Sequence, residues 1–172
     1  MPGNSFINFG IEVKGESRQE GYPGTNGWIE IGDWNWDIES ESSFDKGSGS
    51  SSGKATPGVF GFSHFYDRAS PVIMTRLVQG KHFPLVTVET LKQTGDDKPK
   101  PFMRVVIEEA FISKVSSKGG DDGAVSQDIE MVFKKISLHY KAQNNLGVLE
   151  SSVKTFGWIV DENTTEYTKN SL

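Results

Sequence analysis

The chain has 172 residues, a formal net charge of −5 and no cysteine, so its length suits one domain, and disulfides, thiolate metal sites and cysteine nucleophiles are excluded. No cluster of Lys and Arg indicates nucleic-acid binding, and no apolar run is long enough to insert in a membrane or to act as a secretory signal. The apolar pattern therefore predicts a soluble, cytoplasmic protein, and the 19 glycines in the chain predict a turn-rich β fold.

The first predicted strand lies near the N-terminus. Its alternating apolar positions are Ile7, Phe9, Ile11 and Val13. Such alternation with polar residues predicts a strand with one buried face. Residues 15–27 are polar and glycine-rich, so a loop should follow.

The second predicted strand changes its buried face partway along. Ile29 and Ile31 share odd parity, and the apolar residues that follow are even: Trp34, Trp36 and Ile38. A change of parity within one strand indicates a bulge, which we expect at Gly32-Asp33. The even residues should face the core. The opposite face would then carry an acidic stripe of Asp33, Asn35, Asp37, Glu39 and Glu41.

A Gly/Ser segment and a helix come next. Residues 45–56 are rich in Gly and Ser and cannot form a core alone, so they predict a flexible loop. A third, aromatic strand is expected over 59–66. A helix is expected over 70–79, where Ser70 can cap the start, Pro71 fits the first turn and Gly80 can end it. The stripe predicted to pack on a sheet is Ile73, Met74, Leu77 and Val78.

The rest of the chain alternates between strands and turns. Strands are expected at 83–93, 102–116, 126–142 and 154–160, with a bulge at Lys134-Lys135 where the apolar parity changes. The polar tail, 162–172, should fray. About seven strands and one helix predict a mainly β fold, a small antiparallel β-barrel of two sheets with one short α-helix packed at its side. We expect a single domain over 1–172.

No pattern in the sequence indicates a catalytic, cofactor or metal site. GSGSSSGKA (47–55) resembles a phosphate-binding loop, but Ser48 stands where the first glycine is needed and Ala55 replaces the magnesium-binding hydroxyl. Ser63 and His64 point to opposite faces of a strand, so neither activates the other. The histidines also lack metal-ligand spacing. We therefore predict that the protein is not an enzyme.

Several segments together resemble a known family. They are VKGES (13–17), the W-N-W strand (34–36), SPVIMTRLVQGKHFP (70–84) and FGW (156–158), in that order. The chain resembles the hemolysin-coregulated protein (Hcp) family, the tube subunit of bacterial type VI secretion, from about Ser5 to Asn163. The helix followed by GKHFP is the most specific of these segments.

The resemblance implies an assembly and a route. Six copies would form a ring, and rings would stack into a tube inside a contractile sheath, behind a tip spike protein. Effector proteins would be held in the lumen. The subunit would assemble in the bacterial cytoplasm and be exported without a signal peptide.

The resemblance also implies roles for particular residues. Asn35, Asp37 and Glu39 would face the lumen, and Lys46 and Lys54 would lie on a loop that contacts other subunits or rings. The alternatives are a carbohydrate-binding β-sandwich module, for which the four tryptophans would supply a platform, and a β-barrel hydrolase. The platform is disfavoured because Trp34 and Trp36 share the core parity.

Overall fold

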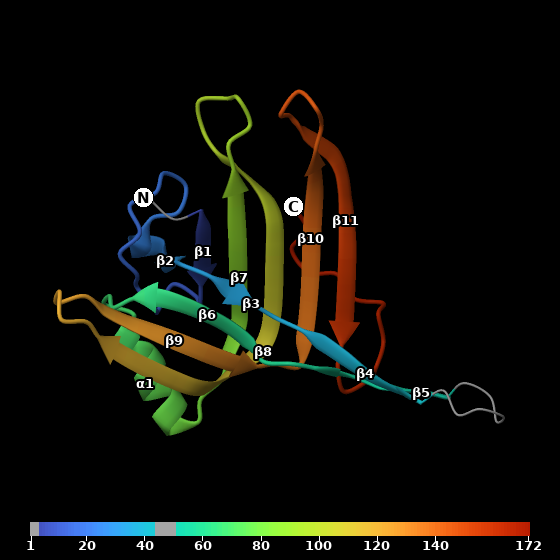
Figure 1. The fold of residues 1–172 in the computed structure, drawn as a ribbon, viewed down its shortest axis with the longest axis horizontal. Helices are drawn as coiled ribbons and strands as arrows, with labels where there is room; N and C mark the ends of the chain where they lie inside the picture. The colour runs from blue at the N-terminus through green and yellow to red at the C-terminus, as the bar shows by residue number, and fades with distance from the viewer. Residues whose placement is uncertain (1–3, 44–50) are drawn as a thin grey trace.

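The structure is a computed structural model that describes residues 4–43 and 51–172 (Figure 1). This part of the chain folds into a nine-stranded antiparallel sheet, a two-stranded antiparallel sheet and one α-helix, which confirms the predicted mainly β class. Its elements are β1 (Ser5–Asn8), the 3-10 helix η1 (Gly24–Asn26), β2 (Trp28–Ile31), β3 (Trp34–Asn35), β4 (Ile38–Ser43), β5 (Ser51–Pro57), β6 (Phe60–Phe65), α1 (Ser70–Gln79), β7 (Phe83–Lys92), β8 (Lys100–Gly119), β9 (Val125–Val132), β10 (Lys135–Gln143) and β11 (Leu149–Ile159).

The 20-residue strand β8 connects the two halves of the large sheet. Its first half pairs with β7 on one side and with β10 on the other, and its second half pairs with β9. Glu109 lies between the halves with φ of 53°, a left-handed conformation that turns the strand. The sheet order β2-β1-β7-β8-β9-β6-β3 therefore folds back over itself around the core.

Both predicted bulges are junctions between separate strands. At Gly32-Asp33 the chain leaves β2 and enters β3, which pairs with β6 at the other end of the sheet. At Phe133-Lys134 it leaves β9 and enters β10, which pairs with the other half of β8. The parity changes were read correctly from the sequence, but their cause is a change of sheet rather than one extra residue in a continuous strand.

The first strand is shorter than predicted. It ends at Asn8, and the chain turns at Gly10, whose φ is 109°. Ile11 consequently lies outside the strand and is 67% exposed, which corrects its predicted place on the buried face. Phe6 and Ile7 are both fully buried, because Tyr22 from the loop stacks on Phe6 at 4.9 Å and covers the second face.

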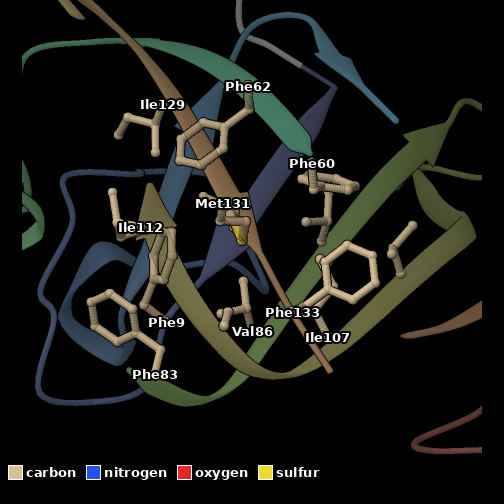
Figure 2. Packing of buried hydrophobic residues seen from close by; sticks show 14 of the residues in the cluster. Phe9, Phe60, Phe62, Phe83, Val86, Ile107, Ile112, Ile129, Met131 and Phe133 are labelled. Atoms are coloured by element: carbon tan, nitrogen blue, oxygen red, sulfur yellow. The ribbon is translucent and has the colours of Figure 1, made fainter. Parts of the chain in front are cut away.

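Aromatic and branched side chains from both halves of the sheet meet in the core (Figure 2). Phe9 and Phe83 have ring centroids 4.8 Å apart, and Met131 from β9 is fully buried between the layers. Burial of a side chain of this size stabilises the fold by about 1.5–3 kcal/mol. These contacts join strands that are far apart in the sequence, so the core fixes the fold of the two halves against each other.

The helix has the predicted bounds but a narrower packing face. Ala69, rather than Ser70, is the residue before its first turn, and Gly80 ends it with φ of 64°. Ile73 is fully buried in the core, Leu77 packs partly against it, and Met74 is half-buried. Val78 is 82% exposed, which corrects its predicted packing role. The reason is geometric, since a residue five positions after Ile73 lies about 140° around the helix from it.

A two-stranded ribbon replaces much of the predicted Gly/Ser loop. Residues 51–56 belong to β5, which pairs with β4 through Ile38↔Pro57, Glu39↔Thr56 and Ser40↔Ala55, so the expectation of a flexible loop over them is wrong. The ribbon extends away from the body of the sheet (Figure 1). Backbone pairing between the two strands forms it without a core of its own. Residues 45–50 of the predicted loop lie outside the described residues.

The C-terminal tail, expected to fray, is held on the sheet. After β11 the chain turns at Asn163 and crosses β11 and β10 toward β8 (Figure 1). It covers side chains that would otherwise form a solvated sheet face, among them His139, which is fully buried. Polar composition alone did not reveal this, because the tail is bound mainly through its backbone.

Candidate assembly surfaces

The three residues predicted to face a lumen lie on different elements. Asn35 is exposed on β3 and pairs with Gly61 of β6. Asp37 lies at the junction with the ribbon, where its backbone oxygen accepts a hydrogen bond of 2.9 Å from the Gly58 N–H. Glu39 is exposed on the ribbon strand β4. All three point to solvent, but only Asn35 lies on the wall of the large sheet.

Asn35 lines a polar groove of about 390 Å³ on the outer face of β3, β6, β9 and β8. The charged residues that line it are Asp33, Asp128, Glu130 and Lys114. Three carboxylates around one ammonium give this face an acidic character. The groove extends the acidic stripe across strands that the sequence did not place beside β3, because strand pairing is not encoded in local parity.

The tryptophans of the W-N-W strand contribute to the core. Trp34 stacks on Phe60 with ring centroids 5.4 Å apart, and Trp36 packs between Phe133 and Phe156 at 6.0 and 6.2 Å. Both rings are half-buried, whereas Ile38 is 44% exposed, which corrects its predicted place in the core. Because these rings pack on their neighbours, they do not form a flat platform for a sugar.

The ribbon carries the one described lysine of the predicted contact loop. Lys54 is exposed on β5, and Lys46 lies outside the described residues. Glu41 lies opposite a register shift between β4 and β5, where the backbone of Gly53 approaches it closely. The ribbon thus displays the carboxylates of Glu39 and Glu41 and the ammonium of Lys54 away from the large sheet.

A second group of exposed apolar side chains lies at the end of β6 and on α1, which Tyr66 and Met74 connect. Phe65 is 73% exposed, and the Tyr66 hydroxyl lies 3.7 Å from the Met74 sulfur. Met74 and Val78 line a shallow depression of about 460 Å³ on the outer side of the helix. Large apolar side chains that gather on one face of a small domain mark an interaction surface.

A buried ionic network was missed by the sequence analysis. Arg104 on β8 forms an ion pair of 2.7 Å with Glu89 on β7, and Glu89 accepts a hydrogen bond from the Tyr22 hydroxyl. Burial and the adjacent carboxylate raise the pKa of Tyr22 well above its ordinary value. The network is structural and attaches the loop to the sheet. Its only sequence signal was a pair of charged residues within otherwise apolar strands.

The candidate pairs Ser63-His64 and Glu108-Glu109 do not form a site, and a close Ser–His contact, Ser137 Oγ to His139 Nε2 at 2.8 Å, is buried beneath the C-terminal tail. No three His, Asp or Glu side chains converge on a possible metal position within this part of the chain. Buried His64 contacts Gln127 at 3.0 Å rather than Ser63, and burial lowers the pKa of His64. Glu108 and Glu109 form ion pairs with different lysines, Lys169 and Lys134. Among the described helices, none is long and apolar enough to cross a bilayer.

Comparison with known proteins gives a consistent result. A family model described as "Type VI secretion system effector, Hcp" matches residues 6–141. The curated protein hcp1 of Pseudomonas aeruginosa is 24% identical over 103 residues, which are 59% of this chain and 63% of that protein. The alignment thus spans less than two thirds of that relative.

Solved structures agree with the fold. A structure described as a type six secretion system protein has a TM-score of 0.83 at 24% identity, covering 93% of this chain and 97% of the other. Hcp1 from Salmonella typhimurium has a TM-score of 0.73 at 25% identity, covering 95% and 98%. Since the family model matches more than half of the chain, the protein belongs to the Hcp family of type VI secretion proteins.

Proposed function

We propose that this protein is the subunit of a type VI secretion inner tube, which forms hexameric rings that stack and are exported together with the tip spike. The observation that carries the proposal is the family-model match over residues 6–141. In this proposal the ring assembles in the bacterial cytoplasm inside a contractile sheath, is exported with the tube and holds effector proteins in its lumen. The chain acts as one structural domain and catalyses no reaction.

Two exposed surfaces support assembly from identical copies. A closed ring that also stacks needs one interface that closes and a second that repeats along an axis. The apolar surface of Phe65, Tyr66, Met74 and Val78 suits the first, because burying it gains hydrophobic free energy. The ribbon with Lys54 suits the second, and we assign Lys46 to the same contact.

We place the lumen on the side of the polar groove that Asn35 lines, because carboxylates dominate the charges of this groove. We assign Asn35, Asp37 and Glu39 to the inner wall, where six copies would form an acidic band. Charge complementarity would then favour basic cargo over acidic cargo. The carboxylates of the groove, Asp128 and Glu130, strengthen this band beyond what the W-N-W strand supplies alone.

The mass in solution tests this function. A hexamer should weigh six times 19.0 kDa, or 114 kDa, by light scattering at micromolar concentration. Val78→Glu places a charge on the apolar surface without disturbing the fold, because this side chain is exposed, and should shift the mass toward the monomer. Leu146→Glu, on an equally exposed side chain at a hairpin tip, is the matched control and should leave the ring intact. A monomeric wild-type protein would contradict the proposal.

A further inference from the structure

The C-terminal segment Thr164–Ser171 lies on the outer face of β8, β10 and β11, where it is bound like a ligand (Figure 1). Both backbone polar groups of Lys169, its carbonyl and its N–H, form hydrogen bonds with side chains of β10. The Lys169 carbonyl accepts from His139 Nε2 at 2.9 Å, and the Lys169 N–H donates to Ser137 Oγ at 3.2 Å. Ser137 Oγ also lies 2.8 Å from His139 Nε2, so the two side chains hold the Lys169 backbone as one hydrogen-bonded group.

Arg104 binds the end of the same segment. Its Nη1 donates to the carbonyl oxygens of Asn170 and Ser171, at 2.9 and 3.0 Å. The guanidinium is already oriented by Glu89, which accepts from Arg104 Nε at 2.8 Å and from the Tyr22 hydroxyl. The donors that face the segment are therefore fixed by the sheet and by the N-terminal loop, independently of the segment itself.

Two side chains of the segment are recognised as well. The Tyr167 hydroxyl donates to Glu108, and the Lys169 ammonium lies 3.6 Å from the other oxygen of the same carboxylate. Close approach of the backbone requires a glycine beneath it, since a Cβ on Gly157 would lie 1.7 Å from the Tyr167 carbonyl oxygen. The face thus offers side-chain donors and an acceptor for a peptide backbone, one carboxylate for its side chains, and space for the backbone above Gly157.

The segment contributes little to the rest of the fold. The core cluster contains no residue of Thr164–Ser171 among the described residues. Only a short turn, with Asn163 at φ of 50°, connects the segment to β11. A polar segment held by fixed groups of the sheet and joined through one turn has the character of a tethered peptide ligand.

We propose that the outer face of β8, β10 and β11 is a peptide-binding groove, and that it accepts the segment Thr164–Ser171 from a second copy of the chain as well as from its own. Every copy carries both the groove and a segment that fits it, which is the condition for exchange of an identical element between protomers. The tether gives the resident segment an effective concentration in the millimolar range, so exchange is seen when the resident segment is weakened.

A labelled synthetic peptide of residues 162–172 tests the groove with the full-length chain. Tyr167→Ala weakens the resident segment and leaves the groove unchanged, so this variant should bind the peptide at least about tenfold more tightly than the wild-type chain. Adding Gly157→Ala closes the gap beneath the peptide and should abolish binding. Equal or absent binding by the wild-type chain and Tyr167→Ala would overturn the proposal.

Trypsin cleavage between Lys169 and Asn170, followed by mass spectrometry, reports docking of the resident segment. The wild-type bond should be protected, and Gly157→Ala should expose it by at least about tenfold in rate, because the docked backbone is displaced. Gly119→Ala is the matched control, since a Cβ there meets nothing within 4 Å. Equal cleavage of the two glycine variants would show that Gly157 does not hold the segment in place, and the groove would be refuted.

Mixing two variants tests binding between copies. Gly157→Ala supplies an intact free segment and Tyr167→Ala supplies an open groove, so cleavage of the Gly157→Ala segment should slow when Tyr167→Ala protein is added. Wild-type protein, with its groove occupied, should protect much less. No protection by Tyr167→Ala would overturn exchange between copies. Light-scattering mass, measured in parallel, reports ring assembly separately, so failure of the ring would not be confused with failure of the groove.

Discussion

Arg104 joins three parts of the molecule through one guanidinium. It contacts Glu89 on β7, and through Glu89 the Tyr22 hydroxyl of the N-terminal loop. It also binds the backbone of the C-terminal segment at Asn170. A buried carboxylate is costly unless it is paired and hydrogen-bonded, and here both conditions are met. The N-terminal loop and the C-terminal segment, which both lie on the outer sheet face, are therefore held there by the same Arg104–Glu89 ion pair.

Replacing Arg104 should destabilise the fold strongly. Arg104→Met leaves the Glu89 carboxylate buried without its cation, and the free energy of unfolding should fall by about 3–5 kcal/mol. Denaturant unfolding measures this change. Lys98→Met removes the exposed pair with Glu20 and should change stability by less than about 1 kcal/mol. Similar losses in the two variants would show that burial of Glu89 does not control the effect.

Two buried histidines should make stability depend on pH. Burial lowers the pKa of His64 and of His139 below the ordinary histidine value of about 6.5. As the pH falls below about 6.5, the unfolded chain binds protons at these positions before the folded protein does. The free energy of unfolding should therefore be level above this pH and should fall below it, by at most about 1.4 kcal/mol per pH unit for each histidine.

Thermal melts at about pH 7.5 and pH 5.5 check this expectation. The wild-type Tm should be lower at the acid pH, and His139→Gln should lose less between the two values, because one of the two groups no longer titrates. An equal drop in the variant would mean that His139 does not contribute.

The bounds of helix α1 depend on local sequence, whereas its packing face does not. Pro71 and Gly80 act within one turn of the chain, so the bounds of α1 were predictable. The packing face was not, because it depends on how the helix lies against β8. Ile73 turned inward and Val78 outward, although both belong to the same apolar stripe.

A matched pair of substitutions measures that difference. Ile73→Ala empties a fully buried position and should lower the free energy of unfolding by about 2–5 kcal/mol. Val78→Ala acts on an exposed side chain and should change it by less than about 0.5 kcal/mol. Denaturant unfolding under conditions where the ring is dissociated gives both values. A large loss for Val78→Ala in the separated subunit would mean that the helix is rotated relative to this structure.

The existence of a strand was predictable from the alternation of its own residues. Where a strand ends and which strand it pairs with were not, because these depend on residues far away in the sequence. The strands β6 and β7 were located correctly, but parity merged β2 with β3 and β9 with β10, because nothing local records that consecutive strands pair with different partners. The ribbon was missed for another reason: its residues are too small and polar to signal burial. The docked tail was missed because its contacts use backbone atoms, which every residue has.

Charge should control how the proposed rings stack. A ring of six proposed subunits would carry a formal charge of six times −5, or −30. Stacked rings should repel at low salt, because the screening length is about 30 Å at 0.01 M and about 10 Å at 0.1 M. Short tubes should therefore appear in electron micrographs at the higher salt concentration and separate rings at the lower one. Stacking that does not change with salt would contradict this view.

The proposed assignment of Asn35 and Asp37 to the lumen wall can be tested by making both positions positively charged. Asn35→Arg combined with Asp37→Lys changes each subunit by three charges, so the ring would carry six times −2, or −12. Both positions are exposed, so the ring should still form, while retention of a small basic protein should fall and that of an acidic protein should rise. Asp121→Lys with Asn145→Arg makes the same charge change on exposed hairpin loops and should leave the preference unchanged. Co-elution at low and high salt measures retention. Equal effects of the two double variants would show that net charge, rather than the groove wall, selects the cargo. A reversal confined to the first variant would place Asn35 and Asp37 on the lumen side.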